Sequence, residues 1–472
     1  MANDVRLSDY SSCSFHVSGD CIEIIDTPAE FYAKLIALTR DARQRIVLAS
    51  LYLGTGELER RLVDEISSAL RDRPSLASVR WLLDYCRATR EERAGSSVRL
   101  LQPLVREHPG RVRVHLFHTP LLRGWLKRWL PAQLNECLGV QHVKAYVFDD
   151  LVLVSGANLS DNYFTNRQDR YYAIRCAQLA DYYSALLSAV EQCSFRLGAD
   201  GELRLDRRCE LHPFLESGEG DDDIASFGRM FKAKVEEALL AASSTSATDS
   251  AATTTTDTTV YPLLQVGWAA IDEEDRLIRR LLAQRRAESA LTMASGYFNL
   301  TADYERLLLE QGRFAFDVLA ASPQANGFFM GKGLAKYVPS VYAYAAQQFL
   351  SKSETAGQQH RVSLLEYSRP RWTFHGKGLW WSPLGEGDDA PSVTLVGSSN
   401  FGQRSVWRDV ESTLAIETRD ARLSARLAAE RDRLRAHCDA PVAHASALAA
   451  KSAHHRVPFL VGLLARWIRF YF

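Results

Sequence analysis

The sequence lacks three features that would assign it directly to a protein class. Its eight cysteines form no CxxC pair, so neither a zinc motif nor a dithiol redox motif is present. No apolar run reaches the roughly 18 residues that predict a membrane-spanning helix. Lys+Arg and Asp+Glu both number 57, so the chain has none of the basic excess typical of proteins that coat nucleic acid. We therefore expect reduced cysteines, a soluble or peripheral protein, and no nucleic-acid partner.

The N-terminal residues also lack the pattern of a targeting segment. Five acidic residues occur within the first 26, and they surround no apolar core. A secretory signal needs such a core, and a mitochondrial transit peptide is usually rich in arginine and poor in acids. The sequence itself therefore indicates no clear secretory or transit peptide.

The composition is that of a globular chain long enough for two large domains. Apolar residues make up 46% of the 472 and charged residues 24%. Residues 241–259 contain nothing more apolar than alanine, which predicts a linker unable to offset its own ordering entropy. We expect a first half at 1–215, an acidic and then Ser/Thr-rich linker at 216–260, a second half at 261–440 and an apolar tail at 441–472.

The two halves repeat the same order of elements. Each begins with an apolar run that predicts a buried strand, followed by a helical pattern and two further strands. The paired runs are 46–53 with 291–298, 78–85 with 313–320, and 111–118 with 361–367. Alternating strands and helices predict an α/β fold with largely parallel sheets, built from two similar halves packed together.

A His-x-Lys triplet occurs once in each half, and its surroundings are repeated. Among twelve histidines, only His142 and His375 begin such a triplet. In both halves a strand and a small-residue turn ending in asparagine follow, and an acid comes eleven residues after the asparagine. The matched positions are Lys144 and Lys377, Asn158 and Asn400, and Asp169 and Glu411. One triplet would occur easily by chance, but two with matched surroundings indicate a site.

These residue types suit chemistry at phosphorus. Residues two apart on a strand point to the same face, which places the imidazole beside the ammonium group. The histidine would act as nucleophile or acid, and the lysine would hold phosphoryl oxygens. A carboxylate that accepts from the second ring nitrogen would fix the tautomer. Two facing sets supply one histidine to attack and one to protonate the leaving oxygen. This scheme requires no metal or other cofactor, and the sequence leaves activation by a divalent ion open.

The double element resembles the phospholipase D superfamily, whose repeated motif is HxKxxxxD followed by a GSxN-type turn. The first copy matches through Asp149, whereas the second has Ser382 at the position of the Asp. Within the superfamily, residues 139–172, 322–328 and 374–411 resemble the eukaryotic phosphatidylglycerophosphate synthase family, whose second motif also lacks the Asp. The resemblance implies two phospholipase D-like α/β halves packed around one shared active site.

The resemblance also implies a reaction, namely transfer of the phosphatidyl group of CDP-diacylglycerol to sn-glycerol 3-phosphate with release of CMP. This is the first committed step towards phosphatidylglycerol and cardiolipin. We expect His142 to attack the phosphorus and His375 to protonate CMP and then deprotonate the glycerol hydroxyl, although the sequence leaves open which histidine is the nucleophile. The implied catalytic residues are His142, Lys144, Asp149, His375 and Lys377. Asn158, Ser398 and Asn400 would hold phosphoryl oxygens, and Asp169 and Glu411 would orient the histidines.

Additional cations are expected for two phosphate-bearing substrates. Arg87 and Arg90 follow the second predicted strand, at the end where α/β proteins bind ligands, and are candidates for a substrate phosphate. Arg167 and Arg170 flank Asp169, and Arg404 follows Asn400. Solvated surface arginines remain the alternative interpretation of Arg87 and Arg90.

Two segments have the pattern of membrane-surface helices. Residues 121–130 (LLRGWLKRWL) place leucines and tryptophans on one helical face and cations on the other. The tail at 457–472 is apolar but too short to span a bilayer as a helix, so we expect it to lie in the interface. Packing against the protein's own core is the alternative for both. The resembling family is mitochondrial and associated with the inner membrane.

Other functions stay open at this stage. A phospholipase D, a cardiolipin synthase or a phosphatidylserine synthase would share the double motif and differ in the acceptor. A nuclease of the same superfamily fits less well, because the chain is neutral and carries two lipid-like segments. A lipid-binding scaffold without catalysis is disfavoured by two intact His-x-Lys sets.

Overall fold

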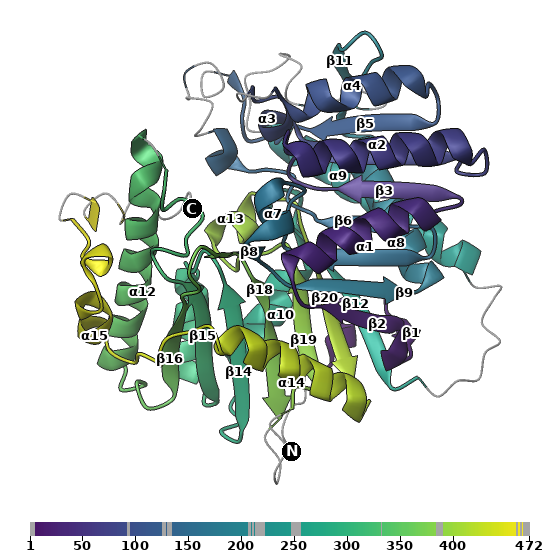
Figure 1. The fold of residues 1–472 in the computed structure, drawn as a ribbon. Coiled ribbons are helices and arrows are strands. Elements are labelled where there is room, and N and C mark those ends of the chain that lie inside the picture. Colours follow the sequence, from purple (N-terminus) through teal and green to yellow (C-terminus); the bar gives the residue numbers. More distant parts are fainter. Residues whose placement is uncertain are drawn as a thin grey trace.

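Two large β-sheets dominate the computed structural model (Figure 1). Within the described residues each sheet has nine strands, and a third sheet has two. The structure describes residues 5–91, 95–124, 129, 135–205, 209, 212, 222–246, 256–331, 333–383, 390–458, 461–462 and 465.

The first sheet has the strand order β11-β10-β5-β4-β3-β6-β7-β9-β2. Its strands are β2 (Ile22–Ile25), β3 (Arg45–Ala49), β4 (Ser78–Asp84), β5 (Val112–Phe117), β6 (Ala145–Phe148), β7 (Leu151–Ser155), β9 (Tyr171–Arg175), β10 (Phe195–Leu197) and β11 (Leu203–Leu205).

The second sheet has the order β1-β12-β20-β19-β18-β14-β15-β16, with β13 paired to β12. Its strands are β1 (Phe15–Val17), β12 (Thr258–Val266), β13 (Ile271–Asp272), β14 (Ser289–Ser295), β15 (Ala315–Ala321), β16 (Val362–Tyr367), β18 (Lys377–Pro383), β19 (Val393–Gly397) and β20 (Glu411–Thr418). The N-terminal strand β1 therefore joins the sheet of the other half.

Seven strands of each sheet correspond in order and direction. β3, β4 and β5 run parallel, and so do β14, β15 and β16. All other pairings of the seven strands are antiparallel in both sheets, including the hairpins β6–β7 and β18–β19. The sheets are thus mixed, and the expectation of largely parallel sheets was wrong. The strand after each His-x-Lys pairs antiparallel with the strand that follows it in the sequence, and β6 and β7 are joined by only two residues.

The helices and the two sheets form three hydrophobic clusters. The helices are α1 (Pro28–Asp41), α2 (Glu57–Asp72), α3 (Tyr85–Ala88), α4 (Ser97–Glu107), α7 (Asp161–Thr165), α8 (Ala177–Glu191), α9 (Asp222–Ser246), α10 (Glu273–Leu282), α11 (Ala302–Arg306), α12 (Val338–Thr355), α13 (Gln403–Trp407), α14 (Ala421–Arg435) and α15 (Ala445–Ala450). α1, α2 and α4 cover one face of the first sheet, and α10 and α12 cover one face of the second.

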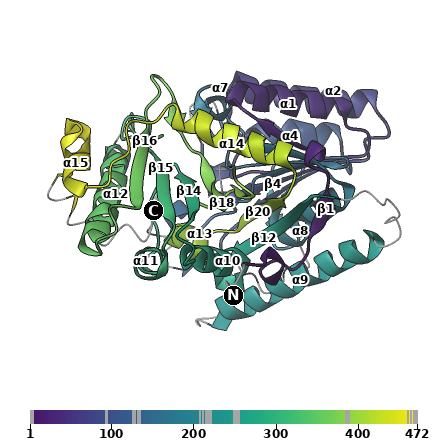
Figure 2. The ribbon, with the colours of Figure 1, turned by 90° about the horizontal axis from the view of Figure 1, so that it is seen from below.

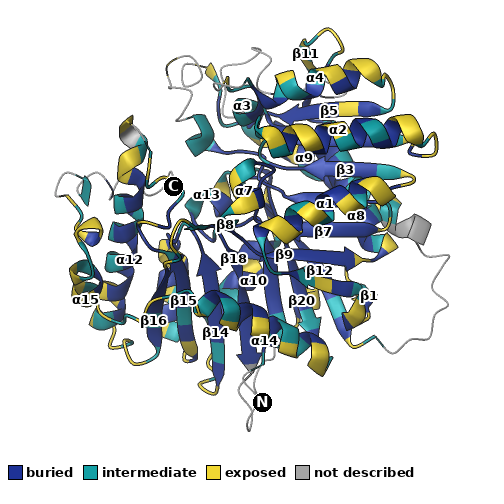
Figure 3. Cartoon of the chain, viewed as in Figure 1, coloured by how far each residue is buried: buried dark blue, intermediate teal, exposed yellow. Residues whose placement is uncertain are grey.

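The third cluster joins the two halves. On β3, Ile46 and Leu48 point to the helices, whereas Val47 and Ala49 point to the cluster shared with the second sheet. This alternation is the two-residue period of a strand with both faces covered. Figure 3 shows the result, with the strands buried and the exposed residues mostly on the outer helices and loops.

The segment 216–260 differs in part from the expected linker. Residues 222–246 form helix α9, which lies beside α8 (Figure 2). Phe227, Phe231 and Val235 of this helix are buried in the shared cluster, at helical spacing. The low apolar content of 241–259 concealed the amphipathic stretch before it, and β12 already begins at Thr258.

The two expected membrane-surface segments lie mostly outside the described residues. Of 121–130, only 121–124 and Trp129 are described, and the Trp129 side chain is exposed. Of 457–472, only five positions are described. Among the described helices, none combines the length and the hydropathy needed to cross a membrane.

Candidate active site

The two His-x-Lys triplets lie where the central hairpins begin. Lys144 directly precedes β6, and Lys377 is the first residue of β18. Each hairpin returns through β7 or β19 into the turn that carries Asn158 or Asn400. Both histidines and both lysines are buried.

A crossed pairing between the halves brings the two triplets together. β17 (Thr373–Phe374) runs parallel to β8 (Arg167–Gln168), and the backbone N–H of His375 donates to the carbonyl of Gln168 at 2.8 Å. On the other side, the N–H of His142 donates to the carbonyl of Val410 at 2.9 Å. Each histidine is therefore held against the other half, next to the residue that precedes that half's acid.

The histidine–acid pairs consequently cross between the halves. His142 Nδ1 lies 3.0 Å from both carboxylate oxygens of Glu411. His375 Nδ1 lies 2.6 Å from Asp169 Oδ2. The expected orienting acids are both in place, but each belongs to the half that does not carry its histidine.

The environments of the two pairs are not equal. Burial raises the pKa of Glu411, but the neighbouring His142, which also shares a hydrogen bond with it, and Lys144 outweigh this effect and lower the pKa to about 2. Burial raises the pKa of Asp169 to about 6, in spite of the neighbouring Lys377. Burial also lowers the pKa of both histidines, more strongly for His375, which faces Lys377. Burial thus favours the neutral form of both imidazoles, and in each the Nδ1 atom faces its carboxylate.

The two lysines are held close to titration at neutral pH. Lys144 Nζ donates to the carbonyl of His142 at 2.8 Å, and Lys377 Nζ to the carbonyl of His375 at 2.9 Å. Burial lowers the pKa of Lys144 to about 7 and that of Lys377 to about 8. An anionic phosphoryl group placed between them would favour the charged form of both.

The asparagines of the two turns face the site with unused oxygens. The side-chain oxygens of Asn158 and Asn400 are buried and accept no hydrogen bond from the described residues. Asn158 Nδ2 donates to the hydroxyl of Tyr163 at 3.1 Å, and that hydroxyl lies 3.1 Å from His375 Nε2. Tyr163 is a site residue that the sequence analysis missed, because it lies outside the repeated motif.

The predicted phosphoryl ligand Ser398 has another role in the structure. Its hydroxyl donates to the carbonyl of Ser412 and accepts from the Ser412 N–H, which closes the end of β19. Ser405, another residue that the motif did not indicate, donates to Glu411 Oε1 at 2.8 Å. The second turn thus supports Glu411 in addition to presenting Asn400.

A glycine in the first turn is required by the close approach of the two halves. A Cβ at Gly156 would lie 2.7 Å from Asp169 Oδ1 and 2.8 Å from the Cδ of Lys377. Any side chain at this position would separate the acid of one half from the lysine of the other. The small residue in the GSxN-type turn therefore has a steric reason.

Asp149, predicted to be catalytic, lies outside the site. It stands at the far end of β6 from His142, with φ of 50°. Its carboxylate accepts from the backbone N–H groups of Arg43, Gln44 and Arg45, at 2.7, 2.8 and 3.0 Å. The Asp of the motif is thus a structural cap on the hairpin, whereas Ser382, at the matching position of the second copy, lies within β18.

The predicted arginines are mostly engaged with carboxylates. Arg87 and Arg90 both pair with Glu136, and the guanidinium of Arg87 lies 4.0 Å from the centre of the Tyr52 ring. Arg170 pairs with the buried Glu430, and Arg404 with Asp409. The location of Arg87 and Arg90 after β4 is as expected, and their role in binding phosphate stays a prediction.

One group of the described residues has the composition of a metal site. His142, Asp409 and Glu411 are buried and offer ligand atoms within 4.8 Å of one another. In the structure these atoms already serve other partners, since Glu411 binds His142 and Asp409 binds Arg404 and the Val140 N–H. In the structure, hydrogen bonds and ion pairs therefore hold these three side chains in place.

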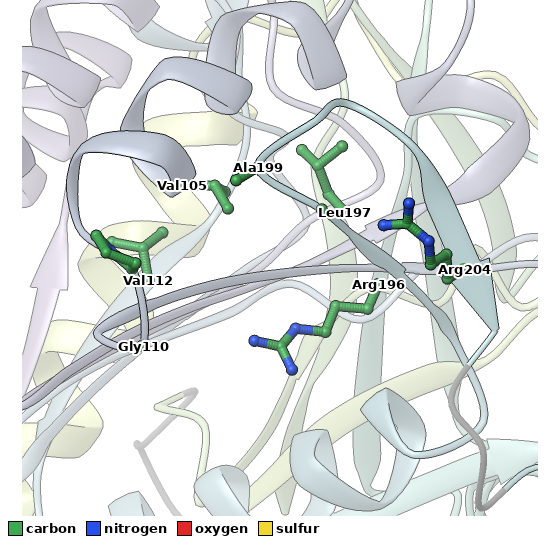
Figure 4. Close-up of a pocket in the computed structure, with 9 residues that line it drawn as sticks. Val105, Gly110, Val112, Arg196, Leu197, Ala199 and Arg204 are labelled. Atoms are coloured by element: carbon green, nitrogen blue, oxygen red, sulfur yellow. The ribbon is translucent and has the colours of Figure 1, made fainter.

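A separate cavity of about 310 Å³ lies at the edge of the first sheet (Figure 4). Its lining comes from α4, β5 and the β10–β11 hairpin and includes Val105, Val112, Arg196 and Arg204. No residue of the histidine pairs lines it, so it is distinct from the site described above.

The chain is similar to a set of eukaryotic enzymes over most of its length. The human protein named mitochondrial CDP-diacylglycerol–glycerol-3-phosphate 3-phosphatidyltransferase is 39% identical over 445 residues, covering 89% of this chain and 78% of the human one. The Saccharomyces cerevisiae protein of the same enzyme name is 35% identical over 441 residues, covering 89% of this chain and 82% of the yeast one. No family model matches the chain.

Among solved structures, the crystal structure of phosphatidylserine synthase from Haemophilus influenzae Rd KW20 has the same fold. It superposes with a TM-score of 0.70 at 23% identity, and the match covers 98% of this chain and 96% of that chain. The fold of this chain is thus shared with that structure over nearly its whole length.

Proposed function

The chain belongs to the family of CDP-diacylglycerol–glycerol-3-phosphate 3-phosphatidyltransferases, and from this membership we propose its reaction. The enzyme transfers the phosphatidyl group of CDP-diacylglycerol to sn-glycerol 3-phosphate and releases CMP. The observation that supports this reaction is the pair of histidine–acid contacts, His142 with Glu411 and His375 with Asp169, each of which crosses between the halves and is buried. Such a pair supplies a nucleophile and an acid–base group at the same phosphorus.

In the first step, His142 Nε2 attacks the phosphorus that bears diacylglycerol. A P–N bond forms, and the P–O bond to the bridging oxygen of the diphosphate breaks. His375 Nε2 gives its proton to that oxygen as CMP leaves. Burial disfavours the protonated form of His375, and the negative diphosphate of the bound donor offsets this effect. The proton itself is the one that His375 takes from the acceptor hydroxyl in the preceding turnover.

In the second step, His375 takes the proton of the glycerol hydroxyl of the acceptor. The resulting oxygen attacks the phosphatidyl-histidine, the P–N bond breaks, and His142 returns to its neutral state. Lys144, Lys377 and the amides of Asn158 and Asn400 hold the phosphoryl oxygens as charge builds up on them.

The assignment of His142 as the nucleophile has two supports. Its Nε2 has no hydrogen-bond partner among the described residues, whereas His375 Nε2 lies 3.1 Å from the Tyr163 hydroxyl. Its acid, Glu411, is ionised throughout the physiological range and increases the electron density of the imidazole. A nucleophile needs a free lone pair, and an acid–base group benefits from a second hydrogen-bonding partner.

The human relative is named as mitochondrial, and we extend this location to the present chain. Association with the inner membrane through 121–130 and 457–472 fits a lipid donor, because both segments combine tryptophan, leucine and arginine. The exposed Trp129, with 76% of its surface accessible, is the described residue that favours this proposal.

The acceptor is tested by CMP release from CDP-diacylglycerol in detergent micelles. Each acceptor is added alone: sn-glycerol 3-phosphate, phosphatidylglycerol, serine or none. We expect release that depends on sn-glycerol 3-phosphate and gives phosphatidylglycerophosphate. CMP release without an added acceptor would indicate a phospholipase. Release that depends on phosphatidylglycerol would indicate a cardiolipin synthase, and release that depends on serine would indicate a phosphatidylserine synthase.

A further inference from the structure

Arg167 lies beside the site and differs from the other arginines there in its surroundings. Arg167 begins β8, and its backbone is in register with Thr373 of β17, two residues before His375. Its Nε donates to the Thr373 hydroxyl at 3.1 Å. The two-stranded sheet that joins the halves therefore fixes this arginine next to the acid–base histidine.

The surroundings of Arg167 are aromatic and hydroxylated. Its guanidinium carbon lies 4.7 Å from the centre of the Tyr163 ring, and Tyr163 also contacts His375, with the ring centres 5.0 Å apart. Tyr297 contacts His375 from another side, at 5.3 Å between ring centres. The net influence of Tyr163, Tyr297 and Tyr52 raises the pKa of Arg167 against the effect of burial.

No carboxylate among the described residues forms an ion pair with Arg167. This distinguishes it from Arg170, Arg404, Arg87 and Arg90, each of which pairs with an aspartate or glutamate. A partly buried guanidinium without a counter-charge is costly unless an anion completes it. The missing charge is therefore expected from a ligand.

A glycine keeps space open at the guanidinium. A Cβ at Gly327 would lie 2.9 Å from Arg167 Nη2 and 3.1 Å from the Tyr297 hydroxyl. Gly327 belongs to the turn that follows β15 in the second half. This turn lies on the side of the second half that faces β8. Arg167, Tyr297 and this turn thus come together from both halves beside His375.

We propose that Arg167 binds the phosphomonoester of the acceptor, so that the glycerol hydroxyl reaches His375. This inference rests on the proposed function, since it requires an acceptor that carries a phosphate. A guanidinium offers a planar fork of donors that matches two phosphate oxygens, and the Tyr163 and Tyr297 hydroxyls add donors at its side. The lysines and asparagines remain available to the phosphoryl group that is transferred.

The test separates the two half-reactions in the full-length enzyme. Arg167→Gln and Arg167→Lys are compared with Arg175→Gln, which changes an exposed arginine at the C-terminal end of β9. The measured quantities are KM for sn-glycerol 3-phosphate, KM for CDP-diacylglycerol, and exchange of labelled CMP into CDP-diacylglycerol without acceptor. Exchange reports the first step alone.

We expect Arg167→Gln to raise KM for sn-glycerol 3-phosphate about 30-fold or more, the size of a lost charge-assisted pair. KM for CDP-diacylglycerol and CMP exchange should stay within about threefold of wild type. Arg167→Lys should restore part of the acceptor affinity, and Arg175→Gln should match wild type.

Three results would overturn the inference. An unchanged KM for sn-glycerol 3-phosphate in Arg167→Gln would exclude a contact with the acceptor phosphate. A parallel loss of CMP exchange and donor affinity would place Arg167 at the donor or in the general structure. A wild-type enzyme that exchanges CMP but does not use sn-glycerol 3-phosphate would refute the proposed function itself, and with it the acceptor phosphate.

Discussion

At the scale of single residues, the site combines groups whose pKa values are displaced toward neutrality. Asp169 has a pKa raised to about 6 and Lys377 a pKa lowered to about 8, both because of burial. Below the first value the carboxylate of Asp169 takes up a proton and no longer accepts from His375. Above the second value Lys377 loses the charge that holds phosphoryl oxygens.

The pH dependence of kcat/KM follows from these two groups. We expect a bell-shaped profile that falls below about pH 6, where Asp169 is protonated, and above about pH 7, where Lys144 loses its charge. Lys377, with a pKa of about 8, would steepen the alkaline limb. Initial rates in constant-ionic-strength buffers from about pH 5 to about pH 10 measure this. A profile that stays flat up to pH 10 would mean that neither lysine needs its charge.

A substitution of Asp149 tests whether this motif residue contributes to stability or to catalysis. Asp149→Ala removes the acceptor of three backbone N–H groups and places alanine at a positive φ, so the free energy of unfolding should fall by about 2–4 kcal/mol. The kcat/KM of the folded variant should remain within about threefold of wild type. Denaturant unfolding and CMP release together check it. A large loss of kcat/KM at unchanged stability would return Asp149 to the catalytic residues.

At the scale of elements, the strands and the small-residue turns were predictable from local pattern. The runs at 46–53 and 78–85 correspond to β3 and β4, because buried strands are short, apolar and bounded by polar residues. The direction of pairing was not predictable, since a strand's own residues do not specify its neighbour. His375 pairs with the acid of the other half because β8 pairs with β17, a contact between segments some two hundred residues apart.

Helix α9 is the element that composition concealed, and its packing is testable. Phe231 is fully buried and its ring centre lies 5.0 Å from that of Trp268. Phe231→Ala should lower the free energy of unfolding by about 3–5 kcal/mol. Leu240→Ala, on the same helix but 71% exposed, should change it by less than about 0.5 kcal/mol. Equal effects of the two substitutions in urea unfolding would contradict the placement of α9.

At the scale of the whole molecule, the two halves are joined by polar contacts as well as by the shared apolar cluster. Arg170 of the first half donates to Glu430 of α14 at 3.0 and 2.9 Å, and both side chains are fully buried. Tyr172 and the Trp380 indole donate to the same carboxylate. This network lies directly after Asp169, so it couples the relative position of the halves to the site.

The buried pair should behave as a unit. Arg170→Met alone should cost about 3–5 kcal/mol of unfolding free energy, because it leaves the Glu430 carboxylate buried without its counter-charge. The double variant Arg170→Met/Glu430→Gln should be less destabilised than the sum of the single variants. A double-mutant cycle by denaturant unfolding measures this coupling. Strictly additive effects would show that the pair does not hold the halves together.

The central claim is that the halves supply two histidines with different roles in one reaction. The most direct test is to mix enzyme with CDP-diacylglycerol in the absence of acceptor, and to follow both the CMP burst and the covalent adduct by mass spectrometry at alkaline pH. The account predicts a burst stoichiometric with enzyme and a phosphatidyl group on His142. His142→Ala should abolish both, and His375→Ala should slow the formation of both. An adduct mapped to His375, or acceptor-dependent turnover that survives in His142→Ala, would contradict it.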